Sequence, residues 1–446
     1  MTVAQDLRSV DIAEVIDRGP WATMQKAVVC LAALTVVLDG FDSQLLGYAI
    51  PVLIKEWGVP RAAFTPVVAA GLIGMSLGSG CAGLVADRIG RRAAILGSVL
   101  VFGLATGLIG LAPDLTTMAV LRFVAGLGIG GGLPSSTTMT AEFTPARHRT
   151  MMITATIVCV PLGGMLAGLY AGSVLPVLGW RALFIIGGAL PLGLLAVLAF
   201  ALPESPRYLA RRPQRWPDLV RMLGRMGRTV PGGTSFGDHT DTSGLARPGV
   251  SALFIKDRGR DTLALWLSFF LCLLAVYSAF SWLPTMLNAS GLNVAAAGAG
   301  LTAYNLGGVL GSLGCAQAIN RLGSRISLVG CALAAAACAF LLEFVDIGQT
   351  TVLILGLGAH GLFVNAVQST LYAVSAHVYP TAIRATGTAS ALAFGRLGAV
   401  LSAFVGASVI SSAGPGSFLT VLGVAMLGAA GSLMLLKHHI PPMSRG

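Results

Sequence analysis

The sequence predicts an all-α membrane protein whose twelve transmembrane helices form two six-helix halves. Over half of the 446 residues are apolar and only 11% are charged, whereas a soluble domain usually carries about 25% charged residues. The apolar residues form runs of roughly 18 or more, each long enough to cross a hydrocarbon core about 30 Å thick. A short basic turn also occurs twice, in positions about half the chain apart.

The apolar runs and the polar turns between them define the predicted domain organisation. We expect spans at 24–47, 63–84, 93–112, 117–140, 151–175, 182–202, 262–287, 296–318, 326–344, 351–375, 387–411 and 417–436. This gives an N-terminal half at 1–202, a linker loop at 203–261 and a C-terminal half at 262–446. Within the loop we expect a basic interfacial helix over 207–228 and a flexible linker over 229–248, which is rich in Gly, Ser, Thr and Pro.

The two halves carry matching turns. The turn at 83–92, GLVADRIGRR, lies between the second and third spans, and a similar turn at 316–325 follows 233 positions later. The turns after the fourth and tenth spans both contain the pattern Pro-x-x-x-Arg, at 145–149 and 380–384. A duplicated helical bundle has a pseudo-symmetric cavity between its halves, and transporters bind their substrate there.

The basic residues lie mainly on one side of the predicted bundle. Of the 29 Lys and Arg, 24 fall in the N-terminus, the even-numbered turns, the central loop and the C-terminus. Because basic loops remain in the cytoplasm, we expect an inner-membrane protein with both termini cytoplasmic. Residues 1–20 contain four acidic residues and no apolar core, so we expect the first span to remain as a helix rather than to be cleaved as a signal peptide.

Several classes of function are disfavoured by the sequence. The net charge of +11 follows the membrane topology, so we expect no nucleic-acid partner. All seven cysteines lie in predicted spans without metal-ligand spacing, so we expect neither a metal site nor disulfides. The glycine-rich fourth span lacks a phosphate-binding GxxxxGK[ST] pattern, and no nucleophile–base pair is evident. We therefore expect no cofactor and no enzymatic activity.

Charged residues inside a span are costly, so the few that occur are candidates for function. Asp39 and Asp42 are three residues apart on the first span and should share a helix face at about the depth of Arg122 on the fourth. A carboxylate that alternately pairs with Arg122 and takes up a proton would couple transport to protons. The alternatives are a purely structural ion pair and carboxylates that face an outer vestibule.

Polar side chains in the second half suggest a substrate site. Arg396 lies near the middle of the eleventh span, and its planar guanidinium suits a carboxylate, although pairing with Asp39 or Asp42 across the cavity is an alternative. Together with Arg122, further candidate ligand contacts are Tyr304, Asn365 and Gln368. Hydrogen bonding between helices is an equal alternative for these amide and aromatic residues. We expect His360 to have a packing or helix-bonding role rather than to relay protons.

The basic turn suggests a gate. Asp87 follows the second span, where it can cap a neighbouring helix and pair with arginines of nearby turns. Contacts of this kind would hold one side closed in one state and release it in the other. The second copy of the turn has Asn320 in place of the aspartate, so we expect a weaker latch there.

Several strings resemble those of a known family. The turn at 83–92 resembles the signature of the major facilitator superfamily. LDGFD at 38–42 resembles the first-helix motif of its aromatic acid:proton symporter family. The same holds for PESPR at 203–207, SWLPT at 281–285, YPTAIRATG at 379–387 and GRLG at 395–398. PESPR also occurs in sugar porters, but the seventh span lacks their paired glutamines.

The resemblance implies a proton-coupled symporter that imports a benzoate-like or hydroxybenzoate-like acid by alternating access. The family's important charges fall on Asp39, Asp42, Asp87, Arg122, Glu142, Arg384 and Arg396. Proton coupling is thereby expected at Asp39 and Asp42, and gating at Asp87, Arg88, Arg91, Glu142 and Arg384. The expected partners are a small organic acid, protons and the lipid bilayer, and we expect a monomer. Carriers of dicarboxylates or arylpropionates, an exporter, and a membrane sensor are the alternatives.

Overall fold

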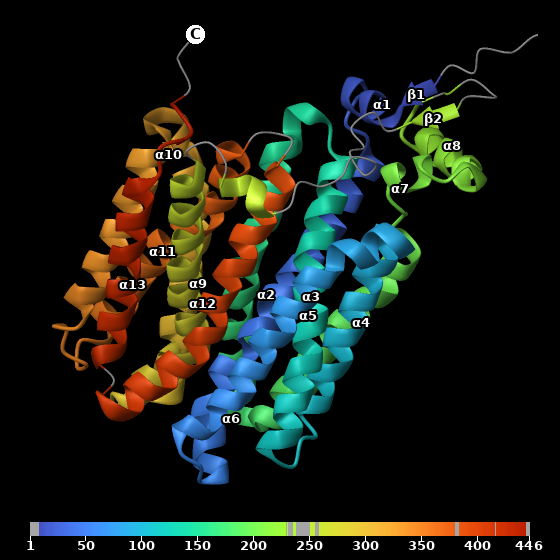
Figure 1. The fold of residues 1–446 in the computed structure, drawn as a ribbon. Helices are drawn as coiled ribbons and strands as arrows, with labels where there is room; N and C mark the ends of the chain where they lie inside the picture. The colour runs from blue at the N-terminus through green and yellow to red at the C-terminus, as the bar shows by residue number, and fades with distance from the viewer. Residues whose placement is uncertain are drawn as a thin grey trace, which may run out of the picture.

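A computed structural model describes residues 9–228, 230, 235–237, 250–254, 258–379, 383–414 and 416–442. The chain forms two helical bundles that lie side by side (Figure 1). The long helices of the first bundle are α2 (Thr23–Trp57), α3 (Thr65–Ile89), α4 (Arg91–Ile109), α5 (Leu115–Phe143) and α6 (Ala146–Ala201). Those of the second are α9 (Arg258–Ala289), α10 (Val294–Leu342), α11 (Thr350–Val378), α12 (Arg384–Ser412) and α13 (Gly416–Leu435).

Ten helices in the described part of the chain are long and apolar enough to cross a membrane. Two of them are too long for one crossing, because 56 residues in α6 and 49 in α10 would extend ~84 Å and ~74 Å at 1.5 Å per residue. Each bends at a glycine with a positive φ, 73° at Gly179 and 79° at Gly323. A residue with a side chain is strained in this backbone region. Each long helix therefore supplies two spans, and the predicted twelve-span, all-α fold is confirmed.

The duplication is also visible in how the helices pack. In the first half, Gly74 and Gly78 of α3 lie against the backbone of α5 at Phe123 and Leu127. In the second half, the corresponding glycines of α10 lie against the backbone of α11. They are Gly307 and Gly311, which face Gly358 and Leu362. Small residues let helix backbones approach closely, so the repeat preserves helix-packing positions as well as turns.

The two halves contact each other through α2 with α9, α6 with α10, and α3 with α12. At Gly47 of α2 a side chain would collide with the backbone carbonyl of Phe280 in α9. Gln44 of α2 and Asn305 of α10 exchange two buried amide hydrogen bonds, at 3.2 and 2.7 Å. This polar pair joins the halves within the bundle, where an unsatisfied amide would be costly.

Short elements gather at one end of the bundle, here called the terminal end. They are β1 (Ser9–Asp11), α1 (Ile12–Arg18), α7 (Pro206–Ala210), α8 (Trp216–Arg225) and β2 (Ser235–Gly237), and the segment 436–442 also lies there (Figure 1). β1 pairs with β2 in parallel. The single helix predicted over 207–228 is wrong: α7 and α8 are separate. Pro213, which has no amide hydrogen to donate, begins a 3-10 turn between them. Most of the predicted linker 229–248 lies outside the described residues.

Candidate functional site

A small cavity lies between the two halves and is lined by polar groups from both. Asp39 and Ser43 of α2 face it from the first half. The second half contributes seven polar side chains: Tyr277 of α9, Ser312 of α10, Asn365, Gln368, Ser369 and Tyr372 of α11, and Arg396 of α12. The cavity volume is about 40 Å³, far below the ~300–1,000 Å³ of typical ligand pockets. The halves must separate somewhat before a substrate can enter.

Arg396 is the cation of this cavity. Its Nη1 donates a hydrogen bond of 2.9 Å to the hydroxyl of Tyr277, and only 8% of the residue is exposed. Its Nε is buried and has no hydrogen-bond partner among the described residues. One edge of the guanidinium is thus fixed by a tyrosine, while another donor remains available. A guanidinium in this state is suited to a carboxylate ligand.

Asp39 faces the same cavity from the other half. Its carboxylate lies beside Gly132 of α5, where an added Cβ would sit 3.5 Å from Oδ2. Within the described residues it forms no direct ion pair, but Arg396 acts on it electrostatically across the cavity. The residue is 5% exposed. An anion and a cation from opposite halves therefore face one small space.

Asp42 has different surroundings. Its Oδ1 accepts a 2.7 Å hydrogen bond from the hydroxyl of Thr106 in α4 and lies 4.0 Å from Nη1 of Arg122 in α5. Arg122 also donates to the carbonyl oxygens of Asp42 and Ser43, both at 3.4 Å. The predicted meeting of the first and fourth spans therefore involves Asp42. Asp39, three residues earlier, lies against the cavity.

The other predicted ligand contacts divide into two groups. Asn365 and Gln368 line the cavity. Tyr304 is fully buried beside Phe280 and His360 and lies behind the cavity wall, so its role as a ligand contact stays a prediction. Nδ1 of His360 lies 2.9 Å from the carbonyl oxygen of Ala335, a contact that joins α11 to α10.

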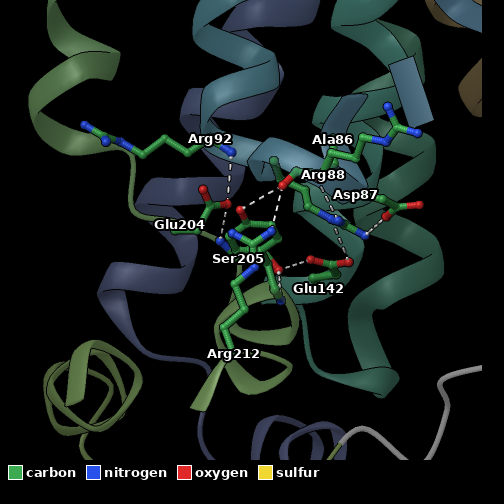
Figure 2. Close-up of polar contacts among 10 residues, drawn as sticks. Ala86, Asp87, Arg88, Arg92, Glu142, Glu204, Ser205 and Arg212 are labelled. Atoms are coloured by element: carbon green, nitrogen blue, oxygen red, sulfur yellow. Dashed lines mark hydrogen bonds and ion pairs between the residues drawn. The ribbon is translucent and has the colours of Figure 1, made fainter. Parts of the chain in front are cut away.

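The predicted gating residues of the first half form a cluster at the terminal end (Figure 2). Arg91 pairs with Asp87 at 2.7 Å and with Glu142 at 3.4 Å. The hydroxyl of Ser205 donates a hydrogen bond to Glu142. The Arg88 side chain is exposed, but its carbonyl oxygen accepts a 2.7 Å hydrogen bond from Arg212 in the loop.

Glu204 caps the helix that follows the turn. Its Oε1 accepts hydrogen bonds from the backbone N–H of Arg92, at 3.1 Å, and of Ser205, at 2.9 Å. The start of α4 offers unpaired N–H groups and the positive end of a helix dipole, which favour a carboxylate. Glu204 thus takes the capping position expected of Asp87. Arg384 lies apart from this cluster, with an exposed side chain that donates to the carbonyl oxygen of Tyr379 at 3.3 Å.

A second, larger cavity of about 710 Å³ lies between α2, α6 and α10. Its lining is almost entirely apolar, with Tyr48 and Thr302 as the polar residues and no charged side chain. A charged acid would lose its hydration there without gaining a partner. The smaller cavity is therefore the better candidate for an anionic substrate.

Two important residues were not predicted as site residues. Tyr277 positions Arg396, but its place is set by packing between α9 and α12, which no local motif reveals. Glu204 belongs to the PESPR string, and its position after a span and before a short helix could have suggested a cap.

Comparison with known proteins decides the family. The family model described as Major Facilitator Superfamily matches residues 32–299 and 265–445. The chain belongs to the Major Facilitator Superfamily. As a member, it is a transporter rather than an enzyme. It is 33% identical over 431 residues to the gallate transporter of Pseudomonas putida, covering 96% of this chain and 95% of the relative. It is 35% identical over 404 residues to the 4-hydroxybenzoate transporter PcaK of Pseudomonas putida, covering 90% of each.

Solved structures of the superfamily share the fold. The D-xylose-proton symporter superposes with a TM-score of 0.69 at 18% identity, over 94% of this chain and 98% of that one. The xylose transporter XylE from E. coli, in a partially occluded inward open conformation, gives a TM-score of 0.73 at 18% identity, over 95% and 99%. The arrangement of two six-span halves is therefore that of major facilitator transporters.

Proposed function

We propose that this protein is a proton-coupled symporter that imports an aromatic carboxylate, such as a hydroxybenzoate, by alternating access. The observation that carries the proposal is that Arg396 and Asp39 face one cavity from opposite halves. Relatives that cover most of the chain are named as transporters of gallate, 4-hydroxybenzoate and benzoate. The tyrosines and amides around Arg396 supply aromatic faces and hydrogen-bonding groups for a hydroxylated ring.

Charge balance in the cavity provides the coupling. In the empty state, the carboxylate of Asp39 is the anion nearest Arg396 across the cavity, and it compensates part of the buried positive charge. A substrate carboxylate that binds Arg396 would bring a second anion into the same space. Protonation of Asp39 removes that conflict and leaves the loaded cavity with the same net charge as the empty one. One proton per monoanion would make transport electroneutral.

The other predicted residues have supporting roles in this scheme. Asp42 with Arg122 would hold α2 against α5 and join the proton pathway next to Asp39. Tyr304 would support the cavity wall, while Asn365 and Gln368 would contact the ligand. For gating we propose the cluster Asp87, Arg88, Arg91 and Glu142, with Arg384 as the counterpart in the second half.

We further propose that the halves 1–202 and 262–446 move as two bodies joined by the loop 203–261. We also propose a monomer in the inner membrane. The bias of basic residues supports an orientation with the terminal end in the cytoplasm.

Uptake of labelled 4-hydroxybenzoate into proteoliposomes tests the proposal. Accumulation above equilibrium only with an inward proton gradient is expected. Uptake that is the same with and without the proton gradient would refute the coupling of transport to protons. Efflux favoured over uptake would support an exporter, and preference for a dicarboxylate or an arylpropionate would redefine the substrate.

A further inference from the structure

The second half keeps Arg321 at the position of Arg88, but its turn lacks the charged pair that Asp87 and Arg91 form in the first half. The offset of 233 residues between the two turns places Asn320 at the position of Asp87 and Ser324 at that of Arg91. The second span of α10 nevertheless begins after Gly323, at a bend like that before α4, and its first N–H groups need acceptors.

The segment after the last span supplies those contacts. The N–H of Ser324 donates to the carbonyl oxygen of Ile440 at 2.9 Å. In return, the N–H of Ile440 donates to the hydroxyl oxygen of Ser324 at 2.8 Å. Nδ1 of His439 lies 3.2 Å from the same hydroxyl, and its Nε2 lies 3.2 Å from the carbonyl oxygen of Leu433. Because a carbonyl only accepts, the proton belongs on Nε2, so Nδ1 accepts from Ser324.

A buried carboxylate holds the same segment from the other side. Asp261, in the first turn of α9, is 1% exposed. Its Oδ1 accepts from the N–H of Lys437 at 2.8 Å, and its Oδ2 lies 2.5 Å from Nδ1 of His438. Residues 437–442 therefore connect the starts of α9 and of the second α10 span to the end of α13.

This arrangement is the counterpart of the capping segment in the first half. At the offset of 233 residues, Lys437 and His438 correspond to Glu204 and Ser205. Both segments follow the sixth span of their half, after Ala201 and after Leu435. Each then crosses the start of the helix that follows the basic turn. The first half uses a carboxylate as the acceptor, and the second half uses a backbone carbonyl oxygen.

We propose that residues 437–442, held by Asp261, form a gating element of the second half in addition to Arg384. They keep the terminal ends of α9, α10 and α13 together so that the half moves as one body. The segment therefore supplies contacts that the turn at 316–325 lacks. The inference rests on the proposed alternating-access function, and its test needs no substrate.

Three variants test the proposal: Asp261→Asn, His438→Ala and a chain that stops after Leu436. Lys437→Ala is the matched control, because Lys437 contacts Asp261 through its backbone and its side chain is exposed. Hydrogen–deuterium exchange is measured at 258–266 and 323–330. We expect exchange there to rise about tenfold in the three variants, as loss of hydrogen bonds to a buried carboxylate implies. The first-half turn at 84–96 and the control should stay unchanged.

Spin labels then report whether the segment controls the movement of the halves. Exposed Arg147 in the first half and Arg321 in the second are replaced by cysteine, in a background without the seven native cysteines. We expect the distance distribution between these labels to shift or broaden in the three variants. Unchanged exchange in all three variants would refute the proposal that residues 437–442 hold these helix ends together. Faster exchange with an unchanged distribution would refute the gating role. Failure of the proposed function would instead appear as absent uptake by the wild-type protein.

Discussion

Replacement of Arg396 should weaken substrate binding by an amount that follows from its contacts. Nη1 of Arg396 already donates a hydrogen bond to the hydroxyl of Tyr277, and Nε of Arg396 is buried without a partner among the described residues. The guanidinium can therefore offer two further donors to a carboxylate. Hydrogen bonds to charged groups contribute about 1.5–3 kcal/mol each. Losing both in Arg396→Ala gives about 3–6 kcal/mol, or roughly 10²–10⁴-fold in Kd, because 1.4 kcal/mol corresponds to a factor of ten.

Arg396→Lys separates geometry from charge. A lysine keeps the positive charge but has no planar fork, so one of the two bonds is lost and Kd should rise about 10–100-fold. Tyr277→Phe should have a smaller effect, about tenfold, since it frees the guanidinium from its positioning hydrogen bond. Arg147→Lys, at an exposed position, serves as the control.

Equilibrium binding of labelled 4-hydroxybenzoate to purified protein is the assay, because it does not depend on transport. The unfolding temperature of each variant is measured in parallel to exclude misfolding. Near-wild-type affinity in both Arg396 variants would refute the carboxylate site. A larger loss in the lysine variant than in the alanine variant would also contradict it.

Three further predictions concern the remaining charges. Asp39→Asn should keep binding and exchange of substrate while losing gradient-driven accumulation, because the variant mimics a permanently protonated carboxyl; counterflow and uphill uptake separate the two. Asp42→Asn should destabilise the fold by about 3–5 kcal/mol, because it leaves Arg122 buried without its anion; thermal unfolding measures this. Glu204→Ala should remove the cap of α4, costing about 1 kcal/mol of stability and slowing turnover without changing Kd.

Each of these predictions has a contradictory outcome. Uphill uptake by Asp39→Asn would move the coupling site elsewhere. The double variant Asp42→Asn/Arg122→Gln should be more stable than Asp42→Asn alone, because it removes the unpaired charge. Equal stability of the two would show that loss of the ion pair does not cause the destabilisation. Lost substrate binding in Glu204→Ala would mean that this residue supports the cavity rather than the gate.

The sequence alone determined the number of spans and the duplication. Apolar runs determine which segments can insert into the membrane. The free energy of transferring a segment from water to lipid depends on its own residues and not on the neighbouring helices. The basic turns and the glycines at 90 and 323 are local features, so their structure could be anticipated. Asn365, Gln368 and Arg396, which face the cavity from α11 and α12, were also predicted, because buried charges and amides are rare in spans.

Which face of each helix meets the cavity was decided only by the tertiary structure. Asp39 and Asp42 were expected to share surroundings, yet one faces Arg396 across the cavity and the other lies beside Arg122. A span that is apolar on all sides carries no amphipathic pattern to orient it, so neighbouring helices set its rotation. The same applies to Tyr277, and to the segment 437–442 on Asp261. Those contacts join residues far apart in the chain, and close packing of the folded helices alone brings them together.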